Sequence, residues 1–158
     1  AGLGSSGLSA EKQDGKQKKP RFELSEKTLV DNKTRLMWPL NGHLAEQAVS
    51  WNDAFEYIDS LNREAYCGYK DWRLPSREEL ETLVKQIKEQ GFGSDRVGTV
   101  AAGLQALGMK NIKDDEYWTS TEHTYNSGEA WFVNLRDGGV RTGMKTLYFH
   151  ILPVRPLP

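Results

Sequence analysis

The order of the hydrophobic patterns along the chain is the feature that most constrains its fold. Residues 21–40 and 117–155 carry strand-like alternation and tight-turn sequences, whereas residues 45–63 and 76–90 repeat apolar residues every three or four positions. Strands and helices that occupy separate parts of a chain are typical of α+β domains, since βαβ units would interleave them. The sequence therefore predicts an α+β domain in which two helices pack on small antiparallel sheets joined by long loops.

Turn residues predict two hairpins. The apolar runs 28–30 and 36–38 flank Asp31-Asn32-Lys33-Thr34, and Asp and Asn tolerate the left-handed backbone of tight turns. The runs 130–135 and 140–144 flank a second turn with the sequence Arg-Asp-Gly-Gly. Further strands are expected at residues 22–24 and 117–121, and a last one at 149–155.

The second helix has the strongest local signal. Ser76 is followed three residues later by Glu79, which is the capping-box arrangement in which each side chain accepts a backbone N–H of the other residue. Apolar residues at 80, 83, 84 and 87 then form one stripe, and the helix is expected to end near Gly91. A first helix is predicted from Ala45 to about Arg63, and a short one at 100–107.

Domain boundaries follow from composition. Residues 1–20 contain glycine, serine and lysine but no aromatic or β-branched residue, so they cannot bury enough apolar area to offset the entropy of ordering. We expect a disordered tail at 1–20 and one folded domain at 21–158. Because the sequence begins at Ala1 rather than at Met, we also expect that a signal peptide or lipoprotein leader was removed, or that a longer product was trimmed. A lipid anchor upstream of Ala1 is one form of this expectation.

Charge and cysteine content exclude several classes of protein. The 21 Lys and Arg balance the 22 Asp and Glu, and a net charge of −1 gives no reason to expect a nucleic-acid partner. No apolar run approaches the roughly 18 residues of a membrane-spanning helix. A single cysteine, Cys67, excludes an internal disulfide framework and a Cys-rich zinc site, and we expect it to be a small buried or half-buried residue.

The chain has no pattern that indicates catalysis or a cofactor. His43, His123 and His150 are scattered, without the spacing of metal ligands, and Ser120 lacks the sequence context of a nucleophile. The acidic run Asp114-Asp115-Glu116 could bind calcium through its oxygens, but such runs are more often solvated turns or helix caps. We therefore expect a protein that is not an enzyme and holds no metal or cofactor.

Several motifs together resemble a known family. They are Thr28-Leu29-Val30-Asp31-Asn32-Lys33-Thr34-Arg35-Leu36-Met37-Trp38, the segment 66–80 around Asp71-Trp72-Arg73-Leu74-Pro75, the strand Tyr117-Trp118-Thr119-Ser120-Thr121, Ala130-Trp131, and Val154-Arg155-Pro156. In order and spacing they are similar to the Lcl C-terminal domain family, the C-terminal domain of a bacterial collagen-like adhesin. The resemblance implies a C-type-lectin-like fold, similar to formylglycine-generating enzymes, an extracytoplasmic setting, and adhesion with binding of sulfated glycans.

The family motifs are interpreted as structural. Trp72 and Leu74 are expected in the core, with Arg73 bound to a carboxylate or to buried carbonyls; a ligand-facing Arg73 is the alternative. The remaining motif residues with this structural interpretation are Trp38, Pro75, Trp118, Trp131 and Arg155. Trp51-Asn52-Asp53 matches a tripeptide at the calcium site of true C-type lectins, but its place in a predicted helix indicates coincidence.

The ligand-binding hypothesis centres on the C-terminal hairpin and the loop before it. Bidentate arginine recognises sulfate or carboxylate, and tyrosine can stack on a sugar ring. The candidate contacts are His123, Tyr125, Asn126, Arg136, Arg141 and Lys145. We therefore expect an exported, non-catalytic recognition domain for an anionic glycan or a protein at the cell surface. The alternative is a structural or assembly component of a bacterial envelope complex without a small ligand.

Overall fold

The computed structural model describes residues 19–93 and 97–158, so nearly all of the predicted tail lies outside the described residues. The described part is an α+β domain, as predicted. Its helices are α2 (Trp51–Arg63), α3 (Arg77–Glu89) and α4 (Val100–Leu107), with a 3-10 turn η1 (Tyr66–Gly68) between α2 and α3. The short helix expected at 100–107 is therefore present and adds a third helix to the two of the predicted architecture. None of these helices is long and apolar enough to cross a membrane.

The strands form two antiparallel sheets. The first has the order β1-β2-β3-β7, from β1 (Phe22–Leu24), β2 (Thr28–Asp31), β3 (Leu36–Pro39) and β7 (Arg155–Pro156). The second has the order β4-β5-β6, from β4 (Glu116–Glu122), β5 (Glu129–Asn134) and β6 (Val140–Met144). Both predicted hairpins, β2-β3 and β5-β6, are confirmed.

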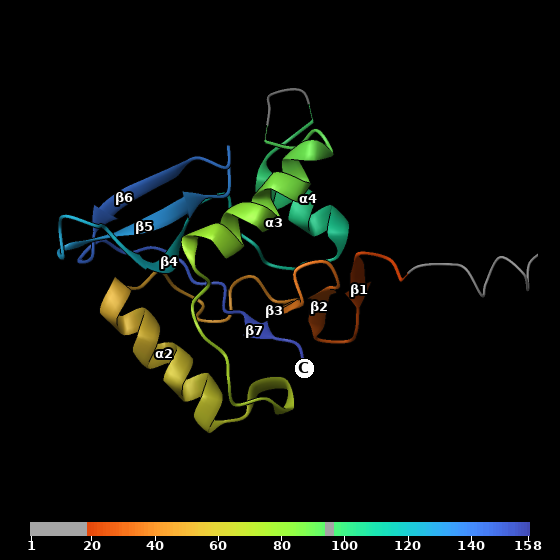
Figure 1. The fold of residues 1–158 in the computed structure, drawn as a ribbon, viewed down its shortest axis with the longest axis horizontal. Helices are drawn as coiled ribbons and strands as arrows, with labels where there is room; N and C mark the ends of the chain where they lie inside the picture. Colours follow the sequence, from red (N-terminus) through yellow and green to blue (C-terminus); the bar gives the residue numbers. More distant parts are fainter. Residues whose placement is uncertain (1–18, 94–96) are drawn as a thin grey trace, which may run out of the picture.

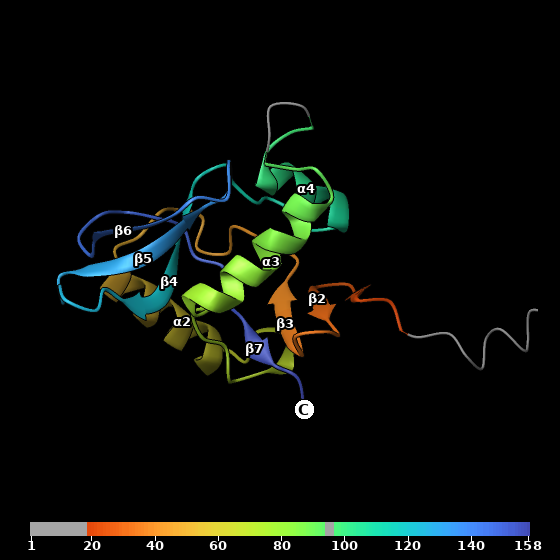
Figure 2. The ribbon, with the colours of Figure 1, turned by 45° about the horizontal axis from the view of Figure 1, so that its top comes forward.

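The sheet β4-β5-β6 lies between two helices (Figures 1 and 2). On one face α3 packs Leu80, Leu83, Val84 and Ile87 against Val133, in a cluster that also includes residues of α4 and β2-β3. On the other face α2 packs Ala54 and Ile58 against Trp118 and Ala130. The described part of the domain thus has an apolar cluster on each face of this sheet.

The N-terminal caps of the helices explain why the predicted start of α3 is confirmed and the predicted start of α2 is wrong. The Ser76 hydroxyl accepts the N–H of Glu79, and the Glu79 carboxylate accepts the N–H of Ser76, so α3 begins as predicted. Helix α2 begins at Trp51, six residues later than predicted from Ala45. Val49 instead exchanges backbone hydrogen bonds with Phe149, one hundred residues away, and Ser50 caps the helix.

The predicted last strand at 149–155 is wrong as a continuous element. Residues Phe149, His150 and Val154 each form a single bridge to a different partner, namely Val49, Tyr117 and Arg73. Only Arg155–Pro156 forms a strand, β7, which pairs with β3. The segment is extended, but its backbone groups are satisfied by several separate elements because it passes between the two sheets.

The family motif at residues 71–75 contacts several parts of the domain. Trp72 and Leu74 are buried, and the indole N–H of Trp72 donates to the carbonyl of Tyr66. Arg73 donates to both oxygens of Glu79 at 2.7 and 2.8 Å. Arg155 donates to both oxygens of Asp71 and lies over the ring of Tyr69. The motif therefore joins the start of α3 to the last strand.

Candidate functional site

The structure divides the six predicted ligand contacts among three places. His123, Tyr125 and Asn126 lie together in the loop between β4 and β5, where Lys145 also reaches after the end of β6. Arg136 lies in the β5-β6 turn at the opposite end of the hairpin. Arg141 pairs with Phe132, whose side chain belongs to the cluster facing α2. The three basic candidates Arg136, Arg141 and Lys145 are therefore not gathered at one place on the hairpin.

Lys145 is already engaged by the protein. Its ammonium group donates to the Glu122 carboxylate and to the Ser127 carbonyl, each at 2.6 Å, and lies 4.1 Å from the ring centre of Trp51. Asn126 is also occupied, since it donates to Glu129 and accepts the N–H of Gly128. The hydrogen bonds of these two side chains stabilise the β4-β5 loop. The same groups are therefore already paired within the protein and are less available to a ligand.

Four side chains at and beside the same loop contact one another in sequence, and we call them the aromatic row: Arg77, Trp131, His123 and Tyr125. The Arg77 guanidinium lies 4.0 Å from the ring centre of Trp131. The His123 ring is nearly parallel to Trp131, with ring centres 6.4 Å apart and an angle of 9°. Tyr125 follows at 6.4 Å from His123, and 92% of its surface is exposed.

Local hydrogen bonds set the geometry of the aromatic row. The Arg77 backbone N–H donates to the Thr121 hydroxyl, and its guanidinium donates to Glu81 at 2.6 Å, so the first turn of α3 is fixed against β4. His123 Nδ1 accepts the N–H of Tyr125, which leaves Nε2 as the ring's free polar atom. Arg77 and His123 are therefore positioned by hydrogen bonds, and Trp131 is positioned by its place in β5. The Tyr125 ring remains open to solvent.

Trp131 differs from the other described tryptophans because its indole N–H is neither hydrogen-bonded within the described residues nor buried. Trp51, Trp72 and Trp118 donate their indole N–H to backbone carbonyls, and Trp38 is buried with its N–H unpaired. Trp131 is half-buried, and no residue in 19–93 or 97–158 accepts its indole N–H. The indole N–H of this half-buried ring is therefore available as a donor to a ligand, although the sequence indicated only a structural role.

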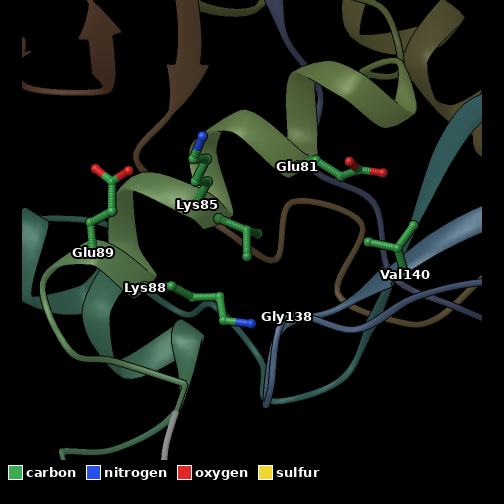
Figure 3. A pocket seen from close by; sticks show the side chains of 7 residues that line it. Glu81, Lys85, Lys88, Glu89, Gly138 and Val140 are labelled. Carbon is green, nitrogen blue, oxygen red and sulfur yellow. The ribbon is translucent and has the colours of Figure 1, made fainter.

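A separate hollow of about 450 Å³ lies between α3 and the β5-β6 hairpin (Figure 3). It is lined by Glu81, Val84, Lys85, Lys88, Glu89, Gly138 and Val140. Figure 3 shows Lys88 reaching toward Gly138, while Glu81 extends toward Val140. Because cationic and anionic side chains share the rim and Val84 and Val140 lie between them, the hollow suits an apolar group better than a small ion.

The acidic run predicted as a possible calcium site is dispersed. Asp114 accepts from the Thr99 hydroxyl, which caps α4, and Asp115 lies 3.5 Å from His150 Nε2. Glu116 belongs to β4. Across the described ranges, no group of three or more His, Cys, Asp or Glu side chains is placed to hold a metal ion.

The histidines are less scattered than the sequence suggested. The His43 and His150 rings meet edge to face with centres 5.1 Å apart, and the Tyr117 ring lies 5.4 Å from His150. Burial lowers the pKa of His150, the neighbouring His43 lowers it further, and Asp115 opposes them. Cys67 is half-buried as predicted, and burial raises the pKa of its thiol, which disfavours the nucleophilic thiolate.

The fold and this surface define a small α+β module with an open aromatic surface. The sequence profile of the Lcl C-terminal domain matches residues 27–155, which is most of the chain. The chain belongs to the Lcl C-terminal domain family, and this membership indicates a surface-associated, adhesin-like domain. Comparison with curated proteins finds no match.

Proposed function

We propose that this domain binds a glycan through the aromatic row and acts as a non-catalytic adhesion module. The observation that carries the proposal is the row itself, in which Tyr125 is almost fully exposed and Trp131 has a free indole N–H. Aromatic faces stack on the apolar faces of sugar rings, and an N–H beside them fixes orientation. Family membership supports the adhesive role.

Charge makes a smaller contribution in this proposal than the sequence suggested. Arg77 is paired with Glu81, and Lys145 is paired with Glu122, so two of the nearby cations are already compensated. Arg141 and Arg136 are exposed but lie away from the row. We infer that stacking and directional hydrogen bonds dominate, and that sulfate groups on the glycan add to binding without being required.

The test is affinity chromatography and titration with heparin and with desulfated heparin. Tyr125→Ala should weaken binding to both about 3- to 10-fold, because one aromatic contact contributes roughly 0.5–1.5 kcal/mol. Tyr148→Ala is the matched control, since Tyr148 is 70% exposed but lies outside the row. His123→Ala should also weaken binding.

Two results would contradict this site. If Tyr125→Ala and Tyr148→Ala bind as the wild type does, the row is not the binding surface. If binding is lost with desulfated heparin and falls steeply with salt, while Arg136→Ala or Arg141→Ala weakens it, charge rather than stacking is responsible.

Three finer statements belong to the same proposal. The C-type-lectin-like fold is supported by helices packed on small antiparallel sheets, and an extracytoplasmic location by the adhesin-like family. We also propose that the domain has no enzymatic role. A role in assembly is a second candidate, favoured by the outer edge of β6, with which no described strand pairs.

A further inference from the structure

Strand β6 ends the second sheet with an unpaired edge. β6 pairs with β5 on one side, and no described strand pairs with its other side. In Figures 1 and 2 it lies at the outer rim of the molecule. Such an edge presents backbone N–H and C=O groups that can pair with another strand.

The register identifies the groups that face outward. Lys145 N–H donates to Gly128 and Asn134 N–H donates to Gly139, so hydrogen-bonded pairs fall at every second residue between these positions. It follows that Val140, Thr142 and Met144 point their backbone groups away from β5. Among the described residues, only the N–H of Leu147 hydrogen-bonds to any of these outward groups, at the Met144 carbonyl.

The sequence of this edge is complementary to itself. In an antiparallel pair of two β6 strands centred on Thr142, the three outward-facing residues meet outward-facing residues of the partner strand. Thr142 faces the partner's Thr142, and Val140 faces the partner's Met144. Arg141 faces the partner's Gly143, so neither like charges nor two large side chains are directly opposed. No residue of β6 carries a negative charge, and no proline interrupts it.

The same pairing provides an occupant for the hollow. Val140 lines the hollow, and cross-strand partners share a face of the sheet. Met144 is 57% exposed, and its long flexible side chain would lie beside the partner's Val140 at the mouth of that hollow. Two equivalent Met144 contacts would remove apolar surface from water at both ends of the paired strands.

We propose that β6 pairs antiparallel with β6 of a second copy of this chain, which joins two three-stranded sheets into one across a two-fold axis at Thr142. The aromatic rows then lie on one continuous sheet, because Trp131 is the β5 partner of Thr142. A dimer of this kind would present two glycan-binding rows together and increase avidity. The pairing itself does not depend on the proposed function.

Sedimentation of the full chain from low micromolar to millimolar concentration tests the proposal. The wild type should rise toward twice the monomer mass. Thr142→Glu and Thr142→Lys each place like charges opposite one another at the axis, and each should raise the dissociation constant several-fold. An equimolar mixture of the two variants should regain dimer formation. Thr124→Glu, at an exposed threonine outside β6, should dimerise as the wild type does.

A second readout is independent of how well the charged variants fold. In a Cys67→Ser background, Thr142→Cys should form an intermolecular disulfide on mild oxidation, since hydrogen-bonded antiparallel partners have Cα atoms about 5.5 Å apart. Thr124→Cys should not. A wild type that remains monomeric throughout, or a Thr142→Glu variant that dimerises with unchanged affinity, would overturn the proposal.

Discussion

At the residue scale, His150 is a half-buried titratable group with several ring and charged neighbours. Its Nδ1 is buried without a partner among the described residues, while Nε2 lies near Asp115. The His43 ring faces it from the loop before α2, and Lys113 adds positive charge from the segment before β4. A second proton on this ring would therefore be poorly solvated and repelled by its neighbours.

This environment predicts a loss of stability in mild acid. Folding lowers the pKa of His150. When the pH falls below the ordinary histidine pKa of about 6.5, the unfolded chain therefore binds a proton at this residue more readily than the folded chain does. The free energy of unfolding should fall as the pH drops from 7 toward 5. His150→Gln should flatten this decline in urea titrations, with His123→Gln as a matched control for loss of an imidazole. An unchanged slope in His150→Gln would contradict the assignment.

At the element scale, the β5-β6 turn depends on a glycine that contacts α3. Gly138 has φ +81°, and a Cβ there would lie 2.9 Å from Val84 Cγ1 and 3.1 Å from Lys88 Cδ. Left-handed backbone is costly for residues with a side chain, and here the side chain would also meet the helix. The turn and α3 therefore constrain one another directly.

Gly138→Ala should lower the free energy of unfolding by roughly 1–2 kcal/mol from backbone strain alone. Displacement of Val84 should add to this loss. Gly128→Ala is the control, because Gly128 lies in the β4-β5 turn and has no left-handed backbone, and a Cβ there would meet only Asn126 Oδ1, at 3.3 Å. Equal stability of the two variants in denaturant titration would contradict this account.

The elements that could be predicted from sequence are those whose signals are local. The Ser76-Glu79 capping box and the Asp137-Gly138 turn lie within a few residues, and both features appear as expected. The start of α2 could not be predicted, because the pairing of Val49 with Phe149 ends the helical pattern from a distance. A local apolar repeat cannot show a partner one hundred residues away.

In the candidate site, too, local features could be predicted from the sequence and contacts between distant segments could not. His123 and Tyr125 belong to one loop, and the sequence identified them together. Arg77 meets Trp131 only because α3 docks on β5, and nothing in either local sequence indicates that contact. The placement of Arg141 on the sheet face opposite Trp131 could have been predicted from strand alternation. Thr142 is the partner of Trp131 and shares its face, and Arg141, as the adjacent residue, must point to the other face.

At the scale of the whole molecule, the C-terminal segment 149–157 links the two apolar clusters. Ile151 belongs to the cluster that contains α2, whereas Leu152 and Val154 belong to the cluster that contains α3. Arg155 then donates a hydrogen bond to the Asp71 carboxylate, which attaches the end of this segment to the motif at 71–75. A segment with little regular secondary structure is thus central to the packing of the domain, and its stability comes from side chains rather than from a backbone ladder.

Leu152→Ala should therefore destabilise the domain as severely as a substitution inside a helix. Leu152 and Leu80 of α3 are both fully buried, and truncation of a buried leucine costs roughly 2–5 kcal/mol. Leu147→Ala, at a leucine that is 42% exposed, should cost far less. Urea denaturation followed by tryptophan fluorescence compares Leu152→Ala, Leu80→Ala and Leu147→Ala. If Leu152→Ala resembles Leu147→Ala, the segment covers the clusters without joining them, and the domain is held together by its sheets alone.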